Sequence, residues 1–294
     1  MIADYPLKDK LRPDAADRVI GPEDIRVLFF TCNRRERSGI QGGRKLSKGE
    51  HYIYQTLSSL WMCDPLSHKL AGVDLLVGDG PLNYLEWFYK HTDRVKIHAP
   101  PRDLNKGAAT PHRKLTRNYI RALEFALSTE EKGFLICEDD VVFADNFWKY
   151  ALDAINEMRA HKLRQDGNTL TFYSTGHYIG KNPFYRGQYF CSGGGPFAGL
   201  CGIYYDRECI PSLLSYLKKH EADDPADLLY GAWSDKEWTR YATPVGLIQH
   251  VGGVSAGTSA GMYWTDARFG REMHCYLPGW KKQPYKPFYV PVEE

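Results

Sequence analysis

Short apolar runs alternate with amphipathic segments along the first half of the chain. Runs rich in β-branched and aromatic residues predict strands at residues 25–32, 73–78 and 95–98. Between them, apolar residues at near-helical spacing predict helices at 48–62 and 83–91. This β-α-β-α-β order predicts a doubly wound α/β domain with a mainly parallel sheet.

The clearest helix is predicted at residues 113–127. One of its faces is apolar and another is basic, with Lys114, Arg117 and Arg121 at helical spacing. The basic face is either a solvated charged stripe or a clamp for a diphosphate, because it directly precedes a run of acidic residues.

A predicted strand then ends in three adjacent carboxylates, Glu138, Asp139 and Asp140, before the sequence turns apolar again. An ordinary buried strand has no reason to carry this charge at its tip. The carboxyl ends of parallel strands border the ligand crevice of an open α/β sheet, so these acids are well placed to hold a divalent cation and its phosphate ligands. The alternative is a solvated loop or a helix N-terminus, where acids are also favoured.

The second half of the chain predicts a further mixture of elements. Helices are predicted at 146–161, 210–219 and from 223, and extended segments at 170–174, 199–205 and 245–253. We expect a lead-in over 1–24, a catalytic domain over 25–265 and a C-terminal wrap over 266–294. Within the catalytic domain, 25–143 would bind the nucleotide sugar and 144–265 would serve the acceptor and catalysis.

Composition narrows the class of protein. A chain of 294 residues with 43% hydrophobic residues can bury a large core, and 38 basic against 36 acidic side chains give no global field for nucleic acid or an anionic membrane. Seven cysteines without a CxxC pair favour reduced, buried thiols and a cytoplasmic location. The soluble catalytic domain of a secretory-pathway enzyme would look similar. The sequence shows no signal segment at its start and no apolar window long enough to span a bilayer.

Several of these segments together resemble a known family. Residues 118–127 and 134–143 look like the helix and acidic strand of GT-A-fold glycosyltransferases, where the metal-binding motif of that family lies. Residues 225–229 and 247–252 are similar to segments of the N-acetylglucosaminyltransferase IV family and its relatives that act on GPI glycans. The resemblance covers about 25–253.

The resemblance implies a GT-A-like, Rossmann-like fold, in which helices flank a mostly parallel central sheet and a smaller antiparallel part lies on the acceptor side. It implies metal-dependent transfer of a hexose or N-acetylhexosamine from a nucleotide sugar to a hydroxyl of a glycan or other acceptor. The donor that it favours is a UDP-sugar. Asp140 and His250 would be the metal ligands, and an acid with one imidazole suits Mn²⁺ or Mg²⁺. Glu138 and Asp139 would face the ribose or orient the site. A lone histidine such as His250 is otherwise more often structural.

The same resemblance points to a catalytic base. Asp227 lies in the Pro-x-Asp helix start and would be the general base of an inverting enzyme, with Asp224 and Asp235 as rivals. In a retaining enzyme Asp227 would position the acceptor instead.

Position along the chain suggests further contacts. The residues expected to cradle base, ribose and phosphate are Thr31, Asn33, Arg35, Asp79 and Arg117. Asp79 fits a turn before Gly-Pro equally well. The residues expected to contact the acceptor are Gly194, Gly195 and Trp238.

Three other functions fit parts of the pattern. A sugar-nucleotide nucleotidyltransferase also has acids at strand ends, with a glycine-rich basic loop after its first strand, as loosely seen at residues 34–45. A non-catalytic module could stack the aromatic residues of 178–190 on sugars or bases. A glycosyltransferase could also act on a polyanion such as hydroxymethylated DNA through the basic residues of 34–45, although the near-zero net charge does not favour nucleic acid.

Overall fold

The computed structural model describes most of the chain between residues 19 and 250. The described residues are 19–32, 51–78, 82–108, 110–161, 167–173, 184–185, 191–192, 200–235, 241–243 and 246–250. Residues 266–294, where we expected a C-terminal wrap, lie outside them.

Within the described residues, a nine-stranded sheet has the order β3-β2-β1-β4-β9-β6-β10-β8-β7. Its strands are β1 Ile25–Thr31, β2 Gly72–Val77, β3 Val95–His98, β4 Gly133–Glu138, β6 Thr169–Thr171, β7 Phe184–Tyr185, β8 Cys191–Ser192, β9 Ile203–Asp206 and β10 Tyr241–Ala242. A second, antiparallel sheet pairs β5 Val141–Phe143 with β11 Ile248–His250.

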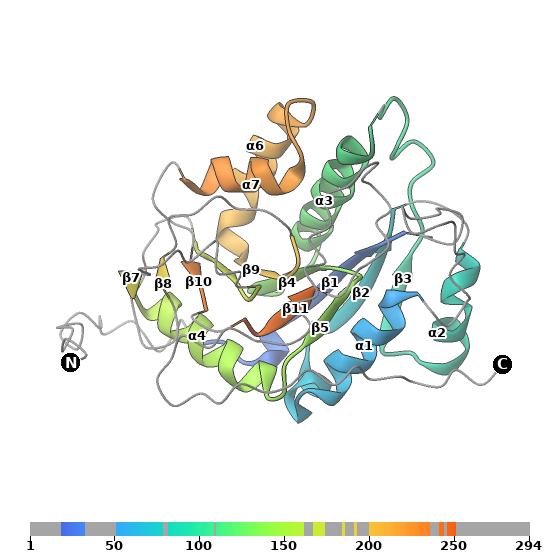
Figure 1. Ribbon diagram of the computed structural model, residues 1–294. Helices are drawn as coiled ribbons and strands as arrows, with labels where there is room; N and C mark the ends of the chain where they lie inside the picture. Colours follow the sequence, from blue (N-terminus) through green and yellow to red (C-terminus); the bar gives the residue numbers. More distant parts are fainter. Residues whose placement is uncertain are drawn as a thin grey trace.

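The helices cover both faces of the central sheet. They are α1 Tyr52–Met62, α2 Glu86–His91, α3 Pro111–Leu127, α4 Phe147–His161, α6 Ile210–His220 and α7 Ala226–Asp235, with short 3₁₀ helices at Pro22–Asp24, Pro65–Lys69, Leu82–Leu85 and Arg207–Cys209. Helices α3, α6 and α7 lie on one side of the sheet, and α1 and α4 lie on the other (Figure 1).

The first four strands in space run parallel, because β1 pairs with both β2 and β4 and β2 pairs with β3. Strand β9 then lies antiparallel between β4 and β6. The structure thus confirms the predicted α/β class, with a mostly parallel sheet flanked by helices and a small antiparallel sheet. Because β1, β2 and β4 are parallel, their carboxyl ends meet at one edge of the sheet.

The local sequence explains why the strands and helices in the first half of the chain form as predicted. Strands β1 and β4 are covered by helices on both faces, so they are almost continuous apolar runs, and Val27, Phe29 and Leu135 are completely buried. Helix α3 begins where the Thr110 hydroxyl accepts a hydrogen bond from the Arg113 amide, with proline in the first turn.

The last part of the expected lead-in packs against the folded domain. Ile20 is 2% exposed, and the Asn156 side chain both accepts from its amide and donates to its carbonyl. Residues 21–24 form a capped 3₁₀ turn that leads directly into β1. Residues 19–24 therefore belong to the folded domain.

The predicted bounds also need correction. The predicted helix 83–91 is a 3₁₀ turn, Leu82–Leu85, followed by α2. Within the described residues, β6 and β9 cover less of the expected extended segments 170–174 and 199–205, with three and four residues, and β11 begins at Ile248. Apolar runs alone do not show where a strand stops pairing.

A buried charge cluster ties β1 to β2 and to the loop before β4. The Arg26 guanidinium donates to Asp74 Oδ2 at 2.7 Å and to Glu131 Oε1 at 2.6 Å, and His98 Nε2 lies 2.7 Å from Asp74 Oδ1. Asp74 is completely buried. Burial raises the pKa of Glu131, but the hydrogen bond and charge of Arg26 outweigh it, so the pKa falls to about 2. Buried charges of this kind are tolerated because they are paired.

We predict that Glu131→Gln lowers the free energy of unfolding at pH 7 by about 2–3 kcal/mol, because it leaves Arg26 with one carboxylate fewer. The depressed pKa stabilises the wild type above about pH 4.5, and this stabilisation is lost as the pH falls towards about 2. Urea unfolding at pH 7, 4 and 3 measures both effects. Glu130→Gln on the exposed neighbouring residue is the control. Equal acid sensitivity of wild type and Glu131→Gln would contradict the assignment.

Candidate active site

The three consecutive acids lie where β4 turns into β5: Glu138 ends β4, and Asp139 and Asp140 form the turn. Phe30 in β1 pairs with Glu138 at the end of β4, so the turn lies at the edge where the parallel strands end. Asp139 and Asp140 are each 4% exposed, and Glu138 is only partly buried. This is the position expected from the sequence.

Helix α1 fixes the backbone of this turn. The Thr56 hydroxyl lies 2.7 Å from the carbonyl oxygens of both Asp139 and Val141, and it accepts from the Val141 amide at 3.2 Å. One turn further along α1, the Ser59 hydroxyl accepts from the Phe143 amide. Thr56 and Ser59 share a helix face because they are three residues apart. The turn therefore has little freedom to redirect its carboxylates.

Thr31 and Asp139, both predicted to contact the nucleotide, contact each other. The Thr31 hydroxyl donates to Asp139 Oδ2 at 2.5 Å, and the Tyr84 hydroxyl lies 3.2 Å from the same Thr31 oxygen. We expected Asp139 either to face ribose or to orient the site, and this buried contact favours the orienting role.

His250 reaches the acids from the last described strand. Strand β11 runs antiparallel to β5, with His250 opposite Val141, one residue after Asp140. His250 Nε2 lies 3.2 Å from Asp140 Oδ2 and 4.0 Å from Glu138 Oε2. The structure thus brings together the two residues expected to bind metal; metal binding itself stays a prediction.

Strand β11 is held in place on three sides. The amides of Leu247 and Ile248 both donate to the Phe172 carbonyl, at 2.9 and 3.1 Å, and the Ala144 amide donates to the Leu247 carbonyl. On the third side, Gly202 packs so closely that a Cβ atom there would lie 2.3 Å from Ile248 Cδ1. Only glycine allows this approach without displacing Ile248.

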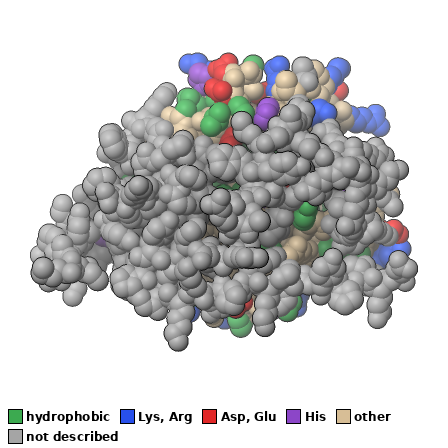
Figure 2. All heavy atoms as spheres, in the orientation of Figure 1, with side chains coloured by type: hydrophobic (Ala, Val, Ile, Leu, Met, Phe, Trp, Pro, Cys, Tyr) green, Lys and Arg blue, Asp and Glu red, His purple; other side chains and the backbone are tan. Residues whose placement is uncertain are grey.

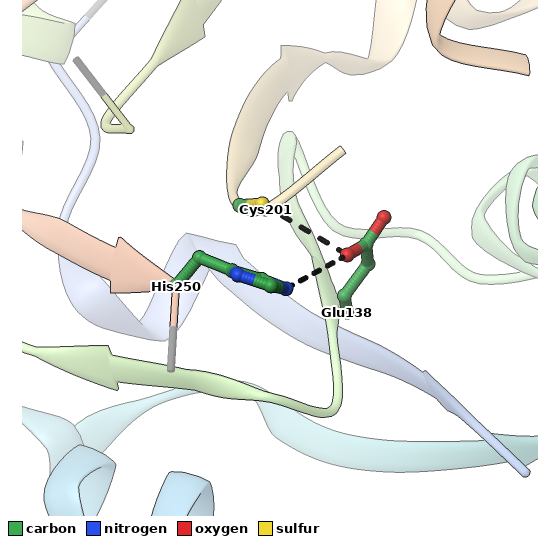
Figure 3. Close-up of side chains that lie close together, drawn as sticks. All are labelled: Glu138, Cys201 and His250. Atoms are coloured by element: carbon green, nitrogen blue, oxygen red, sulfur yellow. Dashed lines mark hydrogen bonds and ion pairs between the residues drawn. The ribbon is translucent and has the colours of Figure 1, made fainter. Parts of the chain in front are cut away.

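Cys201 also lies beside Glu138 and His250, although no motif in the sequence points to it. Its Sγ atom lies 3.8 Å from Glu138 Oε2, and donor atoms of Glu138, Cys201 and His250 all lie within 4.8 Å of one another (Figure 3). Burial raises the pKa of the Cys201 thiol well above its usual value, and the nearby carboxylates of Glu138, Asp140 and Asp227 raise it further. We had treated all seven cysteines as structural thiols. No spacing signal marks Cys201, because its partners come from β4 and β11, which are distant in sequence.

Asp227, the expected base, lies partly buried in the first turn of α7. Its carboxylate contributes to the raised pKa of the Cys201 thiol. Of the rival bases, Asp224 is exposed before α7, and the side chain of Asp235 lies outside the described part of the structure.

Arg117, which we expected to contact a phosphate, contacts other groups of the protein. Its guanidinium donates to Glu221 Oε1 at 2.6 Å and to the carbonyls of Leu104 and Lys106. Arg121 on the same face donates to the carbonyls of Val77, His98 and Ala99. Arg117 and Arg121 therefore do not form a solvated stripe: they hold the ends of β2 and β3 and the segment that follows β3. A phosphate role for Arg117 stays a prediction that these contacts do not support.

The surface around these helices carries charge of both signs. Figure 2 shows basic, acidic and histidine side chains mixed along the upper edge of the molecule, over α6 and α3. This mixture agrees with the near-zero net charge.

Several expected contacts cannot be placed. Asn33, Arg35, Asp79, Gly194, Gly195 and Trp238 all lie outside the described residues. The basic loop at 34–45 and most of the aromatic segment at 178–190 lie outside them as well. Of the helices that the structure describes, none is long and apolar enough to cross a membrane.

We predict that Gly202→Ala lowers the free energy of unfolding by about 1–3 kcal/mol, because the added methyl group overpacks Ile248. Ile248→Val removes the clashing Cδ1 atom at its own cost of about 0.5–1.5 kcal/mol. The double variant should then lose less free energy of unfolding than the two single variants lose together. The difference should be at least about 0.5 kcal/mol. Chemical unfolding of the four proteins measures this coupling, and strictly additive costs would refute the contact.

No protein-family model matches the sequence, and no curated protein matches it. Among solved structures, S. aureus TarS, a glycosyltransferase, is 14% identical with a TM-score of 0.43 over 74% of this chain and 34% of that one. A shorter form of TarS gives 14% identity and a TM-score of 0.41, over 74% and 57%. A Bacillus anthracis protein assigned as a glucose-1-phosphate thymidylyltransferase, in complex with a sucrose, is 11% identical with a TM-score of 0.47. This match covers 77% of this chain and 89% of that one. The chain thus spans about a third of the full TarS structure, and all three likenesses are distant.

Proposed function

We propose that this chain is a metal-dependent glycosyltransferase that moves a sugar from a nucleotide sugar to an acceptor hydroxyl. The observation that carries the proposal is the 3.2 Å contact between His250 Nε2 and Asp140 Oδ2. Two residues from separate strands meet there, at the sheet edge where ligands of α/β proteins bind. The motifs that resemble GT-A glycosyltransferases supply these same two residues.

The side chains at this edge fit a divalent cation. Asp140 is almost fully buried, yet its carboxylate shares the His250 imidazole with a second carboxylate, Glu138. Carboxylate oxygen and neutral imidazole nitrogen are common ligands of divalent metals. Asp140 and His250 would hold the ion, and when bound it would supply Lewis-acid stabilisation of the departing diphosphate.

The remaining residues of the turn would orient the donor. Thr31 and Asp139 fix each other at the ends of β1 and β4, where a nucleotide would lie above the sheet edge. Glu138 is partly exposed and can accept a hydrogen bond from a ribose or sugar hydroxyl. UDP-N-acetylglucosamine is the first donor to test, because two of the motifs are similar to those of the N-acetylglucosaminyltransferase IV family.

Asp227 would act as the general base of an inverting reaction. The Asp227 carboxylate would take the proton of the acceptor hydroxyl. As it does so, the hydroxyl oxygen would bond to the anomeric carbon of the donor sugar, and the bond between that carbon and the diphosphate oxygen would break. The support is its place in the first turn of α7, near Cys201 and the acidic turn.

A nucleotidyltransferase could use the same acidic edge, and the products separate the two reactions. Release of UDP from a UDP-sugar, dependent on an acceptor, supports glycosyl transfer. Formation of UTP, dependent on pyrophosphate, would replace the proposal with nucleotidyl transfer.

We predict that Asp140→Asn abolishes the metal-dependent thermal stabilisation of the protein by UDP and lowers sugar transfer at least about 100-fold, with the fold retained. Thermal shift with UDP and Mn²⁺, with and without chelator, measures the first effect. Asp153→Asn on the exposed face of α4 is the matched control. Undiminished transfer by Asp140→Asn, or by wild type in chelator, would refute metal dependence.

We predict that Asp227→Asn lowers kcat by about 10²–10⁴-fold and leaves the affinity for UDP within about twofold, because a base acts on the acceptor and not on the nucleotide. Asp224→Asn, which alters the exposed rival three residues earlier, should keep near-normal kcat. The reverse result would move the base to Asp224, and a loss of UDP affinity in Asp227→Asn would make it a donor-binding residue.

A further inference from the structure

Cys201 belongs to the proposed metal site by position. Its Sγ atom lies 3.8 Å from Glu138 Oε2, and Glu138 Oε2 lies 4.0 Å from His250 Nε2. The same imidazole nitrogen lies 3.2 Å from Asp140 Oδ2. A thiol, an imidazole and a carboxylate from three segments of the chain thus lie within 4.8 Å of one another (Figure 3), and a second carboxylate, that of Asp140, adjoins them through the imidazole.

We infer that the site takes a thiophilic divalent cation, Zn²⁺ or Co²⁺, in preference to Mg²⁺ or Mn²⁺, with Cys201 as a ligand. The inference rests on the proposed function in one respect, since it concerns the ion that Asp140 and His250 would hold. It changes the expectation of Mn²⁺ or Mg²⁺, which took account of only the acid and the histidine.

Three of the distances between donor atoms are close to those found around a four-coordinate ion. Bonds of about 2.0 Å to nitrogen or oxygen and about 2.3 Å to sulfur put tetrahedral ligand atoms about 3.3–3.7 Å apart. The three distances of 3.2, 3.8 and 4.0 Å lie within about half an ångström of that range. Small side-chain rotations of Glu138 and His250, which are both partly exposed, would close the difference.

The backbone holds Cys201 where a ligand is needed. The next residue, Gly202, accepts a hydrogen bond from the Phe172 amide at 3.0 Å and packs against Ile248. Phe172 and Ile248 also position the strand that carries His250. The sulfur and the imidazole are therefore fixed by the same contacts, which is the preorganisation expected of a ligand pair.

The chemistry of the donor set decides the metal. A thiolate is a soft ligand that favours zinc and cobalt over magnesium and manganese, which prefer oxygen. On binding, the Cys201 thiol would lose its proton to solvent and the sulfur would bond to the ion. Glu138 and His250 are both partly exposed, so a diphosphate oxygen could join or replace a carboxylate there.

Titration of the untagged, metal-free chain with Co²⁺ tests this directly. A thiolate bound to Co²⁺ gives a sulfur-to-metal charge-transfer band in the near ultraviolet, and tetrahedral coordination gives strong visible absorption. We expect both signals to saturate at one Co²⁺ per chain and to disappear when Zn²⁺ is added.

Cys201→Ser replaces the sulfur by a hydroxyl of similar shape. We expect it to lose the charge-transfer band and at least about tenfold in Zn²⁺ affinity, with Mn²⁺ affinity changed less than about threefold. Cys63→Ser is the matched control, because Cys63 is also a buried thiol but donates to the Leu60 carbonyl. Circular dichroism shows whether each variant folds, and Cys201→Ala repeats the test if the serine variant does not.

The outcomes separate this inference from the proposed function. Co²⁺ that binds through Asp140 without a charge-transfer band, or a band that persists in Cys201→Ser, overturns the role of Cys201 and leaves the transferase proposal standing. If neither Co²⁺ nor Mn²⁺ binds and Asp140→Asn changes nothing, both fall.

Discussion

The site depends on the pairing of two three-residue strands, β5 and β11. A two-stranded ribbon of this length is not stable by itself in water. Its partners supply the stability: α1 bonds the turn before β5 through Thr56, and the Phe172 carbonyl accepts from two amides at the start of β11. Because β5 follows the acidic turn directly, this pairing fixes the carboxylate of Asp140 against the imidazole of His250.

Three buried aspartates show why this arrangement differs from ordinary packing. Asp206 is satisfied by Arg159, the Tyr204 hydroxyl and the Asn168 amide, and Asp74 by Arg26 and His98. Each of these pairs a buried negative charge with arginine, the usual structural solution. At the acidic turn, the carboxylates of Asp140 and Glu138 both lie near the His250 imidazole, and Cys201 adds a third potential anion. The proposed cation would be attracted to acidic groups that gather in this way.

The sequence predicted the first half of the fold well, because its strands are buried on both faces and stand out as apolar runs. Strand β3 matches its predicted bounds, and α3 begins only two residues earlier than expected. The pairing of β5 with β11 could not be predicted, since three-residue strands carry no clear period and the contact joins distant parts of the chain. The resemblance to a family of glycosyltransferases suggested Asp140 and His250, whereas Cys201 has no motif and becomes visible only when β9 is placed beside β4.

The partners of the basic helix bear on how the site handles negative charge. A helix with Arg117 and Arg121 on one face suggests phosphate binding, but these guanidinium groups are held by Glu221 and by five backbone carbonyls, at the ends of β2 and β3 and in the segment after β3. Each of these hydrogen bonds that the arginines gave up in order to turn towards a diphosphate would cost about 1.5–3 kcal/mol. A cation between Asp140 and His250 would meet the same negative charge without that loss. Within the described residues, the structural use of the arginines therefore agrees with the proposal that a metal ion, and not α3, would neutralise a departing diphosphate.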